Sequence, residues 1–230
     1  MPDGLSFDEV NKLRDGLSFD ELNKLYDDLH DGESISEPFG EYFGAMGISR
    51  ERRENRTDTA EALKDVFILA LMMLYYMARN GVTDYAEVIS TTVDGYRKVL
   101  IDKGIPVSDS FLWMHIQTAV MDIVATTSGN PDRLFNYTYD RATLIAENEA
   151  NSVWDNAELV DAIATGKSTK TWHAFKDART RSTHRKVDGT TIPITDPFSV
   201  GEYLMMSPKD DSLGAGMEEI ANCRCWLTFS

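Results

Sequence analysis

The sequence predicts an α+β protein in which a mostly helical N-terminal bundle precedes a small C-terminal module with an antiparallel sheet. Up to Gly166, apolar residues recur at helical spacing in segments that end at Gly or Pro. Beyond Gly166, short extended runs are separated by turn residues, as in a small sheet. We therefore predict an arm and linker over residues 1–50, a helical body over 51–166 and an α+β module over 167–230.

A tandem repeat marks the N-terminal arm: DGLSFDEVNKLR at residues 3–14 returns as DGLSFDELNKLY at 15–26. Each copy holds a Ser followed three residues later by a Glu, which is a capping box for a helix start. Two such short amphipathic turns bury little surface alone. We expect them to dock on the body or on a neighbouring subunit; a loosely ordered duplication is the alternative. Residues 27–50, rich in Gly, Ser, Pro and Glu, are predicted to be a linker.

Helical periodicity predicts an up-and-down bundle for the body. Its first helix is capped by Thr57 or Asp58 and ends near Arg79, and its apolar surface from residue 66 onward places it at the centre. The other predicted helices cover residues 83–102, 111–127, 131 to about 150, and 153–164. Short connections between them are typical of helices that alternate in direction. His115 is expected to be a hydrogen-bonded core or surface residue rather than a ligand.

Charge and the length of the longest apolar run argue against DNA and membranes as partners of the body. The whole chain has a net charge of −15, yet residues 167–230 hold nine basic and eight acidic side chains. The preceding 166 residues therefore carry 14 basic and 30 acidic side chains. Bringing such an acidic surface to phosphates costs free energy, so we do not expect the body to wrap DNA. The longest apolar run, 13 residues from Val66, is too short to span a bilayer, and no membrane partner is expected.

The module is predicted to be built from a few short strands. Residues 171–176 alternate like a strand, and Asp188-Gly189 predicts a tight turn that makes a hairpin of residues 185–194. Residues 198–216, rich in Pro, Gly and Ser, are predicted to be a loop, and residues 222–229 a closing strand.

The reactive side chains of the module suggest a structural zinc site. Cys223 and Cys225 are two residues apart, so on a strand they share one face. Together with His184 and either Asp177 or His173 they would supply the four ligands of a tetrahedral zinc ion. In the competing interpretation, the cysteines are simply buried, Asp177 pairs with an arginine (Arg179 or Arg224), and His184 hydrogen-bonds a turn. One structural zinc ion is the cofactor hypothesis, and no other cofactor is expected.

Arginines gather around the same motifs and are predicted to contact a partner or phosphate: Arg179, Arg181, Arg185 and Arg224. An enzyme hypothesis uses His184 as a general base, with Arg179 and Arg181 holding a phosphate, or Cys223 as a nucleophile with His184 as its base. The sequence has no nucleophile elbow, phosphate-binding glycine loop or paired-carboxylate motif, so we expect a protein that is not an enzyme.

Several ordered motifs in residues 140–229 resemble the phage Mu F-like head morphogenesis family. They are Trp172-x4-Asp177-x-Arg179-Thr-Arg181-x2-His184, the Asp188-Gly189 turn, and the closing Asn222-Cys-Arg-Cys225. The chain departs from the family pattern at two places. Pro208-Lys209-Asp210 stands where the family usually has Pro-Gly-Asp, and Asn148-Glu149 stands where it usually has Thr-Glu.

The resemblance implies a structural minor head (capsid) protein of a tailed phage that takes part in head morphogenesis. It implies assembly in the bacterial cytoplasm and a place inside the virion head, associated with the portal or inner capsid. The implied partners are the portal or major capsid protein, with packaged DNA nearby. A virion-carried effector with nuclease or transferase activity is the alternative function.

Overall fold

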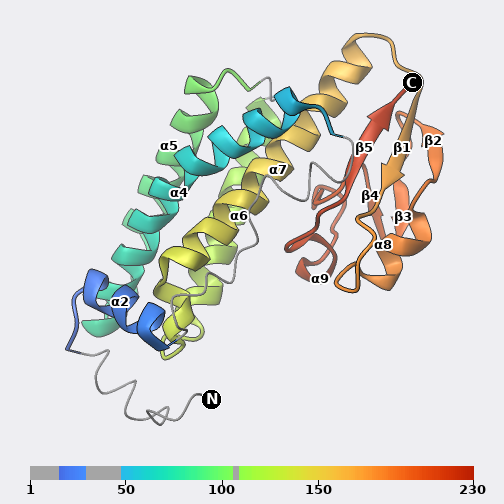
Figure 1. Ribbon diagram of the computed structural model, residues 1–230. Coiled ribbons are helices and arrows are strands. Elements are labelled where there is room, and N and C mark those ends of the chain that lie inside the picture. Colours follow the sequence, from blue (N-terminus) through green and yellow to red (C-terminus); the bar gives the residue numbers. More distant parts are fainter. Residues whose placement is uncertain (1–15, 30–47, 106–108) are drawn as a thin grey trace.

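The computed structural model describes residues 16–29, 48–105 and 109–230, and it confirms the predicted α+β class (Figure 1). The helices of this part are α2 (Phe19–Leu29), α4 (Arg50–Arg79), α5 (Ala86–Asp102), α6 (Asp109–Ser128), the 3-10 helix η1 (Leu134–Tyr137), α7 (Tyr139–Ala164), α8 (Ser182–Val187) and α9 (Met217–Ile220). The strands are β1 (Thr169–His173), β2 (Thr191–Pro193), β3 (Phe198–Val200), β4 (Tyr203–Met205) and β5 (Trp226–Phe229). None of these helices combines the length and the apolar character needed to cross a membrane.

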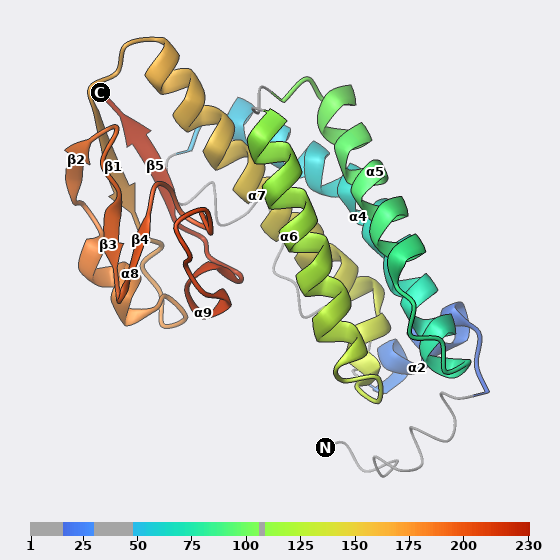
Figure 2. The same cartoon turned by 180° about the vertical axis from the view of Figure 1, so that it is seen from behind.

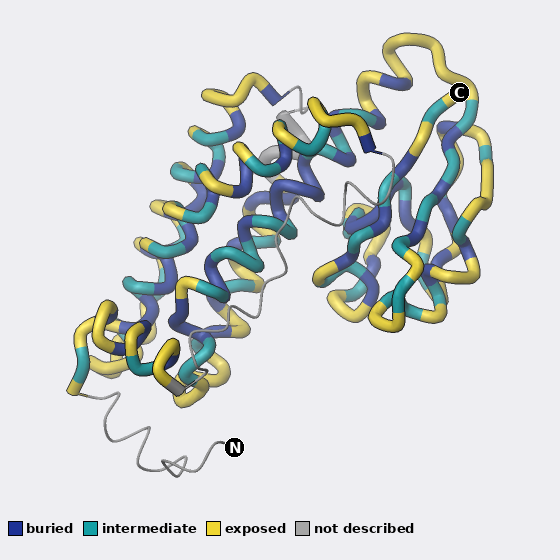
Figure 3. The backbone as a smooth tube through the Cα atoms, in the orientation of Figure 1, coloured by how far each residue is buried: buried dark blue, intermediate teal, exposed yellow. Residues whose placement is uncertain are grey.

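The long helices α4, α5, α6 and α7 form the helical body, with α4 and α7 packed along each other (Figures 1 and 2). α4 also contacts α5 and α6, which confirms that the first long helix is central. Figure 3 shows that the buried residues of these helices lie on the sides where the helices face one another. The core there is mainly aliphatic and aromatic, with Leu63, Phe67, Leu71, Tyr96 and Val153 among its buried members.

The second copy of the repeat forms α2 and docks on the body, as predicted. Ser18 N donates to Glu21 Oε2 over 2.9 Å and Glu21 N donates to Ser18 Oγ over 3.4 Å, so the capping box is present. Phe19 and Leu22 are buried against the body. The first copy lies outside the described residues, and its docking stays a prediction.

The largest differences from the predicted helix boundaries concern α4 and α7. α4 begins at Arg50, with Ser49 as its N-cap. Its first turns are charged and lack apolar periodicity, and their arginines instead bind a carboxylate of α7. α7 runs unbroken from Tyr139 to Ala164, where we expected two helices with a break near residue 150. The small side chains at 150–152 are buried in the interior, so they allow close packing instead of ending the helix.

β1 lies in the middle of a three-stranded antiparallel sheet with the order β2-β1-β5, and β3 and β4 form a separate hairpin. The pair Trp172 and Leu227 sets the register of β1 against β5. Trp172 is fully buried, since it points from β1 into the module. Around it lies a second core, distinct from the helical one: Ala174, Val187, Phe198, Val200, Met205, Ala215, Cys223, Cys225 and Leu227.

Several predictions for the module were wrong. The closing strand begins at Trp226 and not at residue 222, so Cys223 and Cys225 precede it, and the first strand covers Thr169–His173 rather than 171–176. Residues 185–187 belong to α8 and not to a hairpin strand, because His184 and Val187 lie three residues apart and both face the core. The turn at Asp188-Gly189 exists, with Gly189 at φ 76°, but it leads from α8 into β2, which pairs with β1. The segment 198–216 holds the β3–β4 hairpin, so it is not a loop throughout.

Buried charges join the module to the helical body. Arg56 on α4 and Lys209 in the module both contact Asp155 on α7, at 2.9 Å and 3.0 Å, and these side chains are at most 2% exposed. Glu158 adds a second carboxylate to Arg56 at 2.8 Å. Lys209 has φ 65°, a conformation that costs a non-glycine residue about 1–2 kcal/mol. Lys209 stands where the resembled family pattern has glycine, and its ammonium group is paired with Asp155.

His115 makes a second polar link between the two units. Its Nε2 lies 3.0 Å from Glu149 Oε2, and its Nδ1 lies 3.7 Å from Asp211 Oδ1 of the module. Burial lowers the pKa of His115, but the interactions with the carboxylates of Asp211 and Glu149 outweigh burial and raise it to about 10. The histidine is therefore a partnered core residue, as expected.

Asp155→Asn should destabilise the protein by about 3–5 kcal/mol, because it leaves the buried Arg56 and Lys209 cations without their shared carboxylate. Urea unfolding measures the loss. The control is Asp102→Asn in the exposed Lys98–Asp102 pair, which should change stability by less than about 1 kcal/mol. Equal effects of the two substitutions would contradict the role of the buried charges.

Candidate metal centre

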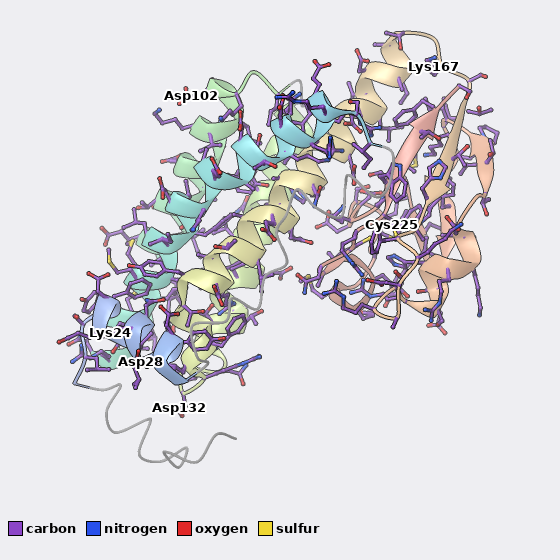
Figure 4. The ribbon with its side chains drawn as sticks, in the orientation of Figure 1. Lys24, Asp28, Asp102, Asp132, Lys167 and Cys225 are labelled. Atoms are coloured by element: carbon purple, nitrogen blue, oxygen red, sulfur yellow. The ribbon has the colours of Figure 1, made fainter. Side chains whose placement is uncertain are left out.

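The second core brings three potential metal ligands together. His184 comes from α8, and Cys223 and Cys225 precede β5 (Figure 4). Asn222 adopts φ 52° and turns the chain into this segment, a conformation that Asn tolerates better than most residues. All three side chains are buried, and both thiols are free.

The distances within the cluster suit a metal ion. His184 Nδ1 lies 3.3 Å from Cys225 Sγ and 3.5 Å from Cys223 Sγ. The three ligand atoms all lie within 4.8 Å of one another. In a tetrahedral zinc site, bonds of about 2.3 Å to sulfur and 2.0–2.1 Å to nitrogen place these atoms about 3.6 Å apart. The side chains thus have nearly the spacing that zinc requires.

A carboxylate lies beside the other edge of the imidazole. His184 Nε2 lies 2.9 Å from Glu219 Oε2, and Thr183 Oγ1 donates to the same oxygen over 2.8 Å. The indole of Trp172 meets the His184 ring edge-on, with centroids 5.6 Å apart. A carboxylate behind a histidine typically fixes the ring so that its free nitrogen faces the metal. Here that nitrogen, Nδ1, faces the two thiols.

The two thiols differ in acidity. Burial opposes ionisation of Cys223, but hydrogen bonds with Cys225 and His184 outweigh it and lower the pKa of Cys223 well below its usual range. The interaction with Cys223 and burial raise the pKa of Cys225 well above its usual range. The thiolate is the form in which a cysteine binds a metal.

Asp177 does not join the cluster. Its carboxylate accepts two hydrogen bonds from Arg224 Nη2, at 2.7 and 2.6 Å, and it accepts the backbone N–H groups of Arg179 and Thr180. Arg224 also stacks on Phe175, with its guanidinium 4.6 Å from the ring centroid. The structure thus gives Asp177 the role of the competing interpretation, an ion pair with Arg224.

His173, the other possible fourth ligand, also lies elsewhere. Its Nε2 is 2.8 Å from Thr228 Oγ1, and its ring stacks on Trp226, which packs against the helical core. Because β1 alternates its side chains, Trp172 faces the cluster and His173 does not. Sequence reasoning missed Glu219 instead, since nothing local links it to a histidine 35 positions earlier.

The predicted contact arginines have different surroundings. Arg181 Nη2 donates to the carbonyl of Ala221, and Arg224 is engaged by Asp177. Arg185 is exposed on α8 next to the exposed Lys186. Arg179 is also exposed and lies 3.4 Å from Asp177 Oδ2. Arg185 and Arg179 thus remain on the surface, while the other two stabilise the module.

A cavity of about 470 Å³ adjoins the cluster, between α7 and the module. His184, Cys223 and Cys225 line it on one side. On the other side lies Glu147, whose burial raises its pKa to about 7 against the effect of Lys64. Three protein ligands leave a fourth zinc position, and a water in this cavity could complete the tetrahedron.

Comparison with known proteins finds one family. Residues 116–228 match the model of the family described as phage Mu protein F like protein. The matched region includes α7 and the whole metal-ligand cluster, and the resemblance seen in the sequence is confirmed. Searches of curated proteins and of solved structures found no match.

Asp177→Asn should show a pH-dependent loss of stability. Burial would raise the pKa of Asp177, but hydrogen bonds from Arg224 and Thr180 lower it to about 2. Because the folded pKa lies below the unfolded one, this stabilisation is complete above about pH 4 and disappears as the pH falls toward about 2.

Chemical unfolding across this pH range should therefore show the wild-type protein and Asp177→Asn converging in stability. Arg224→Ala, which removes the partner, should converge with the wild type in the same way. A gap that stays constant down to the acid limit would contradict the ion pair as its source.

Proposed function

Because residues 116–228 form a phage Mu F-like region, we propose that the chain is a structural minor head protein of a tailed phage. The family match carries this proposal, and it suggests a protein of phage head morphogenesis. The finer role is association with the portal or the inner face of the capsid, inside the virion head. Assembly in the bacterial cytoplasm follows from the same role.

The distribution of charge supports different roles for the helical body and the module. The acidic helical body keeps away from packaged DNA, because like charges repel. The module presents exposed basic side chains on α8, of which Arg185 and Lys186 are the clearest. Guanidinium groups bind carboxylates with two parallel hydrogen bonds, so an acidic patch of the portal or capsid protein fits this surface.

We also propose that the chain works without catalysis. In the enzyme hypothesis, His184 is a general base and Arg181 holds a phosphate. His184 is instead fixed between two thiols and Glu219, and Arg181 donates to a backbone carbonyl. One observation favours the alternative, an effector with nuclease or transferase activity: the cavity beside the cluster, where a zinc-bound water could react.

A zinc ion bound by His184, Cys223 and Cys225 is part of the proposal. It would link α8 to the segment before β5 and so stabilise a module that has a small core. Glu219 would orient the histidine and not bind the metal itself. The ion would serve a docking element that must hold its shape during assembly.

Charge reversal on α8 should reduce incorporation into heads. Arg185→Glu/Lys186→Glu replaces attraction by repulsion at the proposed contact, and we expect at least about a tenfold loss of copies per head. Quantitative mass spectrometry of purified heads measures it. The matched control, Lys98→Glu/Lys103→Glu, reverses two exposed charges of the body and should leave the copy number unchanged. Equal incorporation of both variants would contradict docking through α8.

Metal analysis of the chain purified from zinc-supplemented cells should find about one zinc per chain. His184→Ala, Cys223→Ala and Cys225→Ala should each reduce the content below about half an equivalent. Asp177→Ala and His173→Ala, which lie outside the cluster, are the controls and should retain the ion. Glu219→Gln should weaken zinc affinity by about 10–100-fold. A wild-type chain with less than about half an equivalent would refute the site.

A further inference from the structure

The second copy of the repeat docks at a defined place on the body. We name it the tyrosine groove: Tyr75 and Arg79 at the end of α4, Phe135 and Tyr137 of η1, and Tyr139 at the start of α7. The second copy of the repeat occupies it as α2 (Figure 1). Phe19 packs edge-on against Tyr75 and Tyr139, with centroids 6.2 and 5.6 Å apart.

Polar contacts fix the second copy in the groove. Asn23 makes two of them: its Nδ2 donates to the carbonyl of Tyr137, and its Oδ1 accepts from Tyr139 N over 2.7 Å. Tyr139 Oη donates to Asp20 Oδ1 over 2.7 Å. The carbonyl of Leu17 accepts from Tyr75 Oη and Arg79 Nη1, at 3.0 and 2.7 Å. The groove thus recognises a specific sequence and not only an apolar helix.

The first copy carries the same recognition residues. Ten of its twelve positions are identical to the second copy. Leu5, Ser6, Phe7, Asp8, Glu9 and Asn11 correspond to the residues that contact the groove or cap α2. Two positions differ: Val10 stands for Leu22, and Arg14 stands for Tyr26.

We propose that residues 3–14 are a second, weaker occupant of the tyrosine groove of the same chain, so that the arm can dock in two registers. Leu22 is fully buried, and losing one methylene there weakens docking about five- to tenfold. Tyr26 packs on Phe135, and its replacement by Arg14 costs about another tenfold. The second copy is therefore the resident, and the first copy occupies the groove in about 1–2% of molecules.

The linker permits the exchange. Shifting the arm by one repeat adds 12 residues between the groove and α4, and lengthening a flexible connection changes its closure cost only slightly. A segment of the same chain also has an effective concentration in the millimolar range, so it outcompetes a second copy of the protein in dilute solution.

The consequence is an arm of adjustable reach. A partner that captures residues 15–26 must displace them from the groove, where the first copy replaces them. The partner's apparent affinity is therefore reduced about a hundredfold, which is the difference between the two copies in affinity for the groove. The reserve of 12 residues spans up to about 40 Å when extended. The inference holds whether or not the chain acts in a phage head.

Amide hydrogen exchange of the full-length chain tests the exchange of registers. Phe19→Ala/Leu22→Ala disables the resident copy, so protection should move to residues 3–14. Their protection factors should then be at least about tenfold higher than in the variant that also carries Phe7→Ala/Val10→Ala. Peptides of η1 and the start of α7 should stay protected. The matched control, Phe7→Ala/Val10→Ala, should behave as the wild type. The quadruple variant, with both pairs replaced, should lose protection in both copies and in the groove.

Equal exchange of residues 3–14 in the Phe19→Ala/Leu22→Ala and quadruple variants would overturn the proposal. Protection of residues 3–14 that disappears on dilution would also overturn it, since the occupied groove would then belong to a neighbouring chain. Protection of β1 reports that each variant is folded. Asn23→Ala, matched by Asn11→Ala, is the milder pair if the larger substitutions unfold the chain, and the same transfer of protection is expected.

Discussion

The arrangement of the two units depends on one buried carboxylate. Asp155 on α7 holds a cation from each side, Arg56 from α4 and Lys209 from the module. Without Asp155, Lys209 would lose the carboxylate that it is paired with and Arg56 would keep only Glu158, and an unpaired charge in the interior costs several kcal/mol. Lys209 even accepts a left-handed backbone conformation to reach it. The contact between body and module is therefore selective for one geometry, and α7 acts as the common support of both cores.

Reactive and charged side chains are also paired with one another inside the module. His184 has one nitrogen toward the thiols and the other toward Glu219, and Arg224 is committed to Asp177. These side chains are engaged within the module, and in our proposal the exposed basic residues of α8 contact the partner. Stabilisation by internal charges and, in our proposal, by zinc suits a small element that must dock without changing shape. The match of residues 116–228 to the phage Mu F-like family model supplies the setting for this interpretation.

The sequence predicted what local rules control. The Ser18–Glu21 capping box, the central position of α4 and the proximity of His184 to both cysteines followed from spacing and composition. The rest depends on partners far away in the chain. α8 was mistaken for a strand because the Asp188-Gly189 turn signal is local, whereas the burial of His184 and Val187 is tertiary. Glu219 and Lys209 could not be assigned, since their partners lie 35 and 54 residues away.

The most direct measurement is an image of the assembled phage head at side-chain resolution. Our account predicts that the module sits against the portal or capsid protein with α8 facing acidic side chains, and that Asp155 still holds Arg56 and Lys209. It also predicts density for an ion between His184, Cys223 and Cys225. A module detached from the helical body, or one whose α8 faces only solvent while another surface binds the shell, would contradict the account.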